Sequence, residues 1–175
     1  MRSTLSIAID APARVVFDLA RDVERWPALL PHYRDVRVEE RGPDGAVTAR
    51  MVAIRPVVPM LGYGIPVAWR SRTWAEEATL RLRFVHRGGA TNGMDVTWRI
   101  EDAPAGCRVS IEHDFDPRVP GWAVLVHRLF VQPIATRTLD SFKAIAEAVD
   151  RATAVAPSVG PAARSAGRKS TKTST

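Results

Sequence analysis

From residue 32 to 116 the sequence alternates apolar and polar side chains in short segments, with turn signals between the segments. Ile111, His113 and Phe115, for example, alternate with polar neighbours. A period of two is typical of a strand that buries one face and exposes the other. The connections are too short for the helical crossovers that parallel strands need. The region therefore predicts consecutive antiparallel hairpins, and this excludes most other folds.

The residues before this region predict one strand and two short helices. Residues 5–9 alternate as a strand. Asp10 is the expected N-cap of the first helix, because its carboxylate can accept a hydrogen bond from a free backbone N–H. A second short helix is expected at 27–30, where Pro31 stops it.

Apolar side chains recur at helical spacing between residues 122 and 152, which predicts one long amphipathic helix. Pro133 lies inside this stretch, so we expect a kink or break near Gln132. The order of elements predicts an α+β fold. In it a curved antiparallel sheet of six to seven strands wraps around the C-terminal helix, and two short helices follow the first strand.

Residues 56–66 interrupt the alternation with three prolines and two glycines, yet most of the other side chains are apolar. We expect a loop here. Apolar residues with Gly and Pro at the mouth of a barrel favour a gate over a cavity, and a buried connection is the alternative.

Charge and cysteine content bear on compartment and partners. Of the net charge of +6, the tail 156–175 contributes +4 and contains no acidic residue. We expect one domain over 1–155 and a disordered basic tail, and no nucleic-acid binding by the nearly balanced body. The single cysteine, Cys107, favours a reducing, cytoplasmic location. Neither a secretory signal nor a transmembrane segment is expected.

The sequence lacks the common motifs of metal and cofactor sites. The four histidines show no spacing typical of a metal site, so no metal is expected. No dinucleotide fingerprint, P-loop or nucleophile elbow occurs, so no cofactor is expected.

Local motifs over roughly residues 3–150 resemble the START-like (SRPBCC) superfamily, in particular its polyketide cyclase/dehydrase and lipid transport family. The resemblance rests on Ala11-Pro12, Val16-Phe17, Asp22, Trp26-Pro27, Trp69-x-Ser71 and Gly93-Met94. The superfamily includes aromatase/cyclases of aromatic polyketide synthesis, coenzyme-Q-binding proteins and lipid carriers. The resemblance implies a helix-grip (START/Bet v 1-like) fold with a cavity between the sheet and the long helix.

The aromatase/cyclase resemblance extends to single residues. Trp26-Pro27 and Tyr33 match the family's Trp-Pro and tyrosine, and Trp69 matches the tryptophan of its Trp-x-Ser-x-Arg strand. Thr73 stands where that family has the arginine that is thought to polarise the poly-ketone. Alternation points Arg70 to the opposite face of the sheet, so it is not a substitute.

The inward faces of the predicted strands supply the candidate ligand-binding residues. Ser71 and Thr73 are polar groups on an apolar face, and such groups need partners when buried. Tyr33 and His113 are the candidate catalytic residues, as a proton donor and a base. The predicted ligand-binding set is Trp26, Tyr33, Met51, Trp69, Ser71, Thr73, Phe84, Met94, Trp98 and His113.

Each candidate also has a purely structural interpretation. Tyr33 can be a rim tyrosine with a wet hydroxyl, and His113 can be a hydrogen-bonded core histidine. Met51, Met94 and Trp98 can simply fill the core.

Three functions remain open at this point. The first is a protein, monomeric or weakly dimeric, that binds a hydrophobic polyketide, isoprenoid/quinone or lipid. The second is a cyclase or dehydratase that folds a poly-ketone chain until two carbons meet. The third is an interaction protein that acts through its tail.

Overall fold

The computed structural model describes residues 1–58, 63–117 and 119–155. Its seven-stranded sheet is antiparallel throughout, in the order β1-β7-β6-β5-β4-β3-β2. The predicted hairpin series is thus confirmed; the predicted tail at 156–175 lies outside the described residues. The strands are β1 (Arg2–Ile9), β2 (Tyr33–Arg41), β3 (Val47–Val58), β4 (Tyr63–Glu76), β5 (Arg81–Arg87), β6 (Asp95–Asp102) and β7 (Cys107–Asp114).

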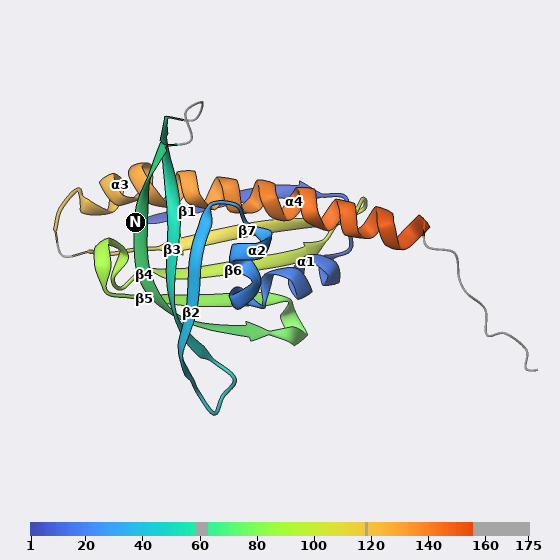
Figure 1. The fold of residues 1–175 in the computed structure, drawn as a ribbon, viewed down its shortest axis with the longest axis horizontal. Helices are drawn as coiled ribbons and strands as arrows, with labels where there is room; N and C mark the ends of the chain where they lie inside the picture. Colours follow the sequence, from blue (N-terminus) through green and yellow to red (C-terminus); the bar gives the residue numbers. More distant parts are fainter. Residues whose placement is uncertain (59–62, 118, 156–175) are drawn as a thin grey trace, which may run out of the picture.

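Helix α4 (Gln132–Val155) lies across one face of the curved sheet, as the helix-grip prediction requires (Figure 1). Its buried side chains, such as Leu139 and Phe142, recur at helical spacing and pack on the core. Within the described ranges, no helix has both the length and the apolarity that a bilayer crossing demands. The remaining helical segments are α1 (Ala13–Ala20), η1 (Val23–Arg25), α2 (Trp26–Leu29), η3 (Glu77–Thr79), η4 (Gly89–Thr91), α3 (Trp122–Val126) and the π-helix η5 (His127–Val131).

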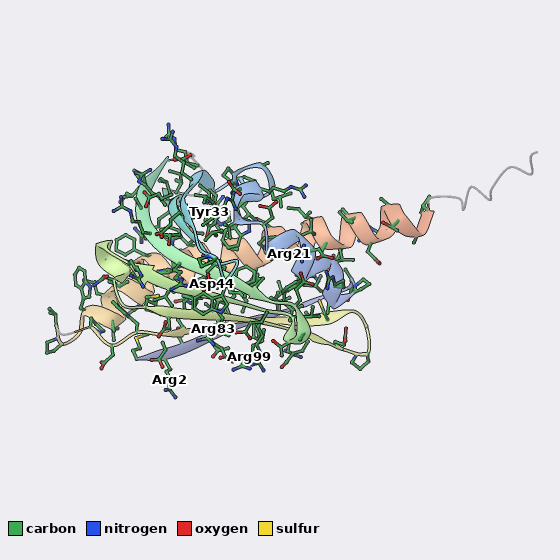
Figure 2. All side chains as sticks on the ribbon, turned by 90° about the horizontal axis from the view of Figure 1, so that it is seen from below. Arg2, Arg21, Tyr33, Asp44, Arg83 and Arg99 are labelled. Atoms are coloured by element: carbon green, nitrogen blue, oxygen red, sulfur yellow. The ribbon has the colours of Figure 1, made fainter. Side chains whose placement is uncertain are left out.

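The outer face of the sheet is charged. Arg83 and Arg99 point away from α1 and α4, on the same side as Arg2 (Figure 2). Ion pairs tie these side chains to neighbouring strands, for example Arg99 to Glu112 at 2.7 Å. One face of the sheet therefore packs on helices and the other meets water, as its alternating pattern predicts.

The predicted N-cap of the first helix is wrong. Helix α1 begins at Ala13 with Pro12 as its N-cap, and no side chain caps it. The backbone N–H of Asp10 instead donates to Glu147 Oε1 at 3.0 Å, which joins the end of β1 to α4. The carbonyl oxygen of Pro12 accepts hydrogen bonds from the backbone N–H groups of Val15 and Val16, at 3.0 and 3.4 Å, and these bonds begin the helix.

The sequence predicts a kink or break near Gln132; helical structure continues through this point, and the chain changes there from a π-helix to an α-helix. Segment η5 ends at Val131, and α4 begins at Gln132. Proline has no N–H to donate to the preceding turn and its ring crowds that turn, so the α-helical hydrogen-bond pattern is interrupted just before it.

The loop predicted at 56–66 is largely wrong, because β3 and β4 continue into it. Pro56 pairs with Gly64, and Ile54 pairs with Pro66. In this stretch β3 has passed the end of β2, and β4 has passed the end of β5. Pro56 and Pro66 therefore lie on strand edges, where a missing N–H removes no sheet hydrogen bond. Residues 59–62, at the tip of the predicted gate, are not described.

Candidate functional site

An aromatic cluster joins the sheet to the helices, with Trp26 at its centre. The Trp26 ring lies 5.0 Å from Tyr33, 5.7 Å from Trp98 and 5.9 Å from Phe142, measured between ring centroids. Its indole N–H donates to the carbonyl oxygen of Ala20 at 3.0 Å, so the end of α1 holds the ring. Trp26 is therefore both a packing residue and a fixed wall for whatever lies beside it.

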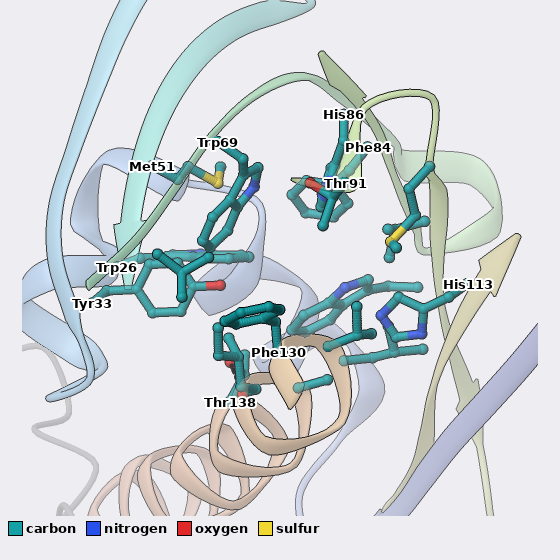
Figure 3. Close-up of a pocket in the computed structure, with 18 residues that line it drawn as sticks. Trp26, Tyr33, Met51, Trp69, Phe84, His86, Thr91, His113, Phe130 and Thr138 are labelled. Carbon is teal, nitrogen blue, oxygen red and sulfur yellow. Dashed lines mark hydrogen bonds between the residues drawn. The ribbon is translucent and has the colours of Figure 1, made fainter. Parts of the chain in front are cut away.

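A hollow of about 80 Å³ lies beside this cluster, between the inner face of the sheet and the start of α4 (Figure 3). Its wall is mostly apolar, and the few polar groups come from Tyr, Trp, His and Thr side chains. The hydroxyl of Tyr33 points into it (Figure 3). The lining residues are Trp26, Tyr33, Met51, Val67, Trp69, Phe84, His86, Thr91, Met94, Val96, Trp98, Ile111, His113, Phe130, Val131, Ile134, Ala135 and Thr138.

The structure brings most of the predicted ligand-binding residues to this wall. The exceptions are Ser71 and Thr73, which are buried but do not line the hollow. They lie further along β4 than Trp69, and the Ser71 hydroxyl donates to the carbonyl oxygen of Arg72 at 3.5 Å. Alternation predicts which face a residue occupies but not how far along the strand the hollow extends. Those on the wall are Trp26, Tyr33, Met51, Trp69, Phe84, Met94, Trp98 and His113.

Other residues of the wall were not predicted from the sequence. His86 follows Phe84 on the same face of β5, so extending the alternation by one step would have found it. Its ring stacks on Trp69 at 5.7 Å, and its Nδ1 lies 3.0 Å from Thr91 Oγ1. No sequence signal marks Thr138 or the other wall residues of η5 and α4, because periodicity gives the buried face of a helix and not its partner.

The polar group at one end of the hollow comprises Tyr33, Thr138 and His32. Thr138 Oγ1 donates to the carbonyl oxygen of Ile134 at 2.8 Å, so the His32 Nε2–H donates to Thr138 Oγ1 at 2.9 Å. Burial raises the pKa of Tyr33 above its ordinary value. The phenol therefore stays protonated at neutral pH and can donate a hydrogen bond or a proton.

Two histidines occupy the other end. Burial and the neighbouring His113 lower the pKa of His86 to about 3. Burial and His127 lower the pKa of His113 to about 4. Both rings are therefore neutral at pH 7. Within the described part of the chain, no three His, Cys, Asp or Glu side chains are grouped closely enough to hold a metal ion.

Two buried polar atoms on the wall have no hydrogen-bond partner among the residues that the structure describes. They are Trp69 Nε1, which can only donate, and His113 Nδ1. Buried polar groups almost always have partners, because leaving one unpaired costs about 1–3 kcal/mol. These atoms indicate that something with polar atoms of its own, a water or a ligand, completes the wall.

The hollow is small in this conformation. About 10–15 Å³ is needed for one water centre, so the volume suits several waters. Small-molecule pockets usually span about 300–1,000 Å³. The wall residues Val67, Trp69, His86 and Phe130 are partly exposed, whereas most of the others are buried. The mouth of the hollow therefore lies between β4, β5 and η5. A ligand larger than a few waters must displace side chains there.

Comparison with known proteins gives a consistent result. A family model described as "Polyketide cyclase / dehydrase and lipid transport" matches residues 1–147. A proposed polyketide cyclase of Streptomyces cyaneus is 32% identical over 111 residues, which cover 62% of this chain and 68% of that protein. The actinorhodin polyketide synthase bifunctional cyclase/dehydratase of Streptomyces coelicolor is 31% identical over 117 residues, 63% of this chain and 33% of that protein.

Solved structures share the fold. The Zhui aromatase/cyclase from Streptomyces sp. R1128 superposes with a TM-score of 0.71 at 18% identity, covering 87% of this chain and 97% of that one. A START superfamily protein from Mycobacterium smegmatis gives a TM-score of 0.62 at 14% identity, covering 85% and 98%. At such identities the likeness concerns the fold alone.

Proposed function

This chain belongs to the polyketide cyclase/dehydrase and lipid transport family of the START-like superfamily, and on that premise we propose that it binds a mostly apolar small molecule in the hollow beside Trp69. The observation that carries the proposal is the pair of unpartnered atoms, Trp69 Nε1 and His113 Nδ1, on an otherwise apolar wall. We further propose that residues 1–155 form one ligand-binding domain. The cytoplasmic location and the monomeric or weakly dimeric state remain predictions.

The polar groups on the wall suit a ligand with oxygen atoms at two places. An oxygen near Trp69 would accept the indole hydrogen bond, and a hydroxyl near His113 would donate to a neutral ring. Tyr33 would donate to an oxygen at the opposite end. Apolar surface between these points would supply most of the affinity, at about 25 cal/mol per Å² removed from water. A flat polycyclic polyketide or a quinone head group has this distribution.

Binding such a ligand requires the wall to open. Phe130 is the best-placed side chain, because it lines the hollow, is partly exposed and belongs to the π-helix η5. The Arg55 guanidinium lies 5.9 Å from its ring centroid, so one side of the ring contacts a polar group while the ring also packs against the core. A π-helix often marks a functional site, and its irregular hydrogen bonds lower the cost of local rearrangement.

A substitution that fills the hollow should abolish binding and spare the fold. Ala135 is buried on the wall, and in Ala135→Phe the added ring would occupy the space of the guest. We expect the Kd for a hydroxylated anthraquinone, measured by quenching of tryptophan fluorescence, to rise at least about tenfold, because the ligand loses apolar contact area.

Thr136→Phe is the matched control. It adds the same ring one residue further along α4, on the exposed face, and should leave the Kd unchanged. Circular dichroism checks that both variants fold. Equal affinities for wild type and Ala135→Phe, with both proteins folded, would place the ligand elsewhere and refute the cavity.

A second candidate function is ring closure and dehydration of a poly-ketone. The relatives named as polyketide cyclases favour it, and so does the protonated Tyr33 hydroxyl that faces the hollow. Thr73 in place of the family's arginine speaks against it. Arg55 is a possible replacement, because it alternates with Met51 and Ala53 toward the inner face of β3 and lies at the mouth beside Phe130.

The two functions separate on a catalytic test. If Tyr33 is the general acid, Tyr33→Phe should lower the rate of cyclisation of a linear poly-ketone by about 100-fold, the lower end of general acid–base effects. Its Kd for the anthraquinone should change little, since the ring remains. The product profile is read by liquid chromatography with mass spectrometry. Identical products and rates with wild type, Tyr33→Phe and no protein would leave binding as the function.

A further inference from the structure

Four arginines stand side by side on the outer face of the sheet. The strand register places Arg37 opposite Arg50, Arg50 opposite Arg70, and Arg70 opposite Arg87. Directly opposed residues of antiparallel strands point to the same side, with Cβ atoms about 4.5–5.5 Å apart. Trp69, the neighbour of Arg70, lines the inner hollow, so this arginine row faces solvent.

Carboxylates neutralise only part of the arginine row. Asp35 lies 3.5 Å from Arg37 and 3.6 Å from Arg50. Glu39 forms an ion pair with Arg70 at 2.7 Å. Arg87, the last arginine of the row, has no carboxylate partner in residues 1–58, 63–117 and 119–155. Like charges directly opposite one another destabilise a sheet, so this end of the row carries uncompensated repulsion.

A groove of about 150 Å³ opens at this uncompensated end. Three arginines of the row reach it from three successive strands, and the turn after β5 closes one side. The turn backbone is bent by Gly88 and Gly89, whose φ angles are +73° and +70°. The groove is lined by Arg50, Ala68, Trp69, Arg70, Arg87, Gly88 and Gly89.

We infer that this groove binds a compact oxyanion, a phosphate or a phosphate ester. Guanidinium groups bind phosphate through paired, charge-assisted hydrogen bonds, and three of them line a groove of this size. The carboxylates of Asp35 and Glu39 pair with Arg50 and Arg70, and they would repel an extended polyanion. A small anion near Arg87 avoids them and removes the repulsion among the arginines. This site shares Trp69 with the wall of the hollow, but none of its arginines lines the hollow.

The test is a titration of the full chain with inorganic pyrophosphate by isothermal calorimetry, at low and at physiological ionic strength. We expect one site per chain. Arg87→Gln breaks no ion pair within the described residues and should weaken binding at least about tenfold, the effect of losing a hydrogen bond to a charged group.

Arg108→Gln is the matched control. Arg108 is exposed on the outer face of β7 and has no ion pair within the described residues, but it does not line the groove. Its loss should change Kd by less than about twofold, because solvent and salt screen distant charges. Equal weakening by both variants, no binding at low salt, or tighter binding of a short DNA duplex that Arg87→Gln leaves unchanged would overturn the inference.

Thermal unfolding gives a second test, because Arg87→Gln should weaken anion binding without lowering the stability of the anion-free protein. Without anion, Arg87→Gln should unfold at the same or a higher temperature than wild type, since it relieves repulsion. At equal concentration, pyrophosphate should raise the unfolding temperature of wild type more than that of the variant. Ala135→Phe should keep its pyrophosphate affinity, which separates a failure of this site from a failure of the cavity.

Discussion

Replacing Phe142 with alanine is expected to lower the free energy of unfolding by about 3–5 kcal/mol, the range for removing a buried aromatic ring. Phe142 is fully buried on α4. Its ring centroid lies 5.6 Å from Trp98 and 5.9 Å from Trp26, so the substitution removes the contacts that hold the helix on the sheet. Domains are typically stable by only about 5–15 kcal/mol, so the loss would be a large fraction of the total.

Urea denaturation monitored by circular dichroism measures this loss. Val149→Ala is the control on the same helix, because Val149 is 40% exposed and its truncation leaves no cavity. We expect its effect to stay within about 0.5 kcal/mol, as for most surface substitutions. A loss below 1 kcal/mol for Phe142→Ala would contradict the packing of α4 on the aromatic cluster. Phe142 does not line the hollow, so its effect concerns stability rather than ligand contact.

The second large effect is a loss of stability in mild acid. Burial, and secondarily the charge of Arg137, lowers the pKa of His32 to about 4. Burial, and secondarily His127, lowers the pKa of His113 to about 4. In an unfolded chain the pKa of a histidine is about 6.5. Between these values the unfolded state binds more protons, so the free energy of unfolding decreases as the pH falls. The contribution is complete above pH 6.5 and is lost as the pH drops to about 4. Each histidine contributes on the order of 3 kcal/mol.

Urea denaturation at pH 7.5, 6, 5 and 4.5 gives the profile. The double variant His32→Gln/His113→Gln should keep only the part of the pH dependence that His86 supplies, because glutamine does not titrate whereas the pKa of His86 is lowered by burial to about 3. Glutamine at position 32 can still donate a hydrogen bond to Thr138, so the variant keeps that contact. Parallel profiles for wild type and the double variant would show that neither histidine is buried in its neutral form.

Most of the fold could be predicted because it depends on local patterns. A period of two with short turns admits only antiparallel neighbours, and a helical stripe near the C-terminus must cover an apolar sheet face. The errors occurred where a distant partner decides. Asp10 reads as a cap, but Glu147, far along the chain, binds its backbone. Pro56 and Pro66 predict a loop from the sequence. In the structure they lie where β3 and β4 extend past the ends of the neighbouring strands, and such strand edges accept proline.

Alternation along the sequence by itself determined which side chains face inward, and so placed Trp69, Met94 and His113 on the inner face of the sheet. Only the tertiary structure decided which inward residues border empty space, leaving Thr73 off the wall and bringing Phe130 and Thr138 onto it. The tertiary structure also decided that the four arginines of the row pair with only two carboxylates within the described residues. A side chain's face follows from the geometry of its own strand, whereas a cavity and a charge balance follow from the distances between segments far apart in the chain.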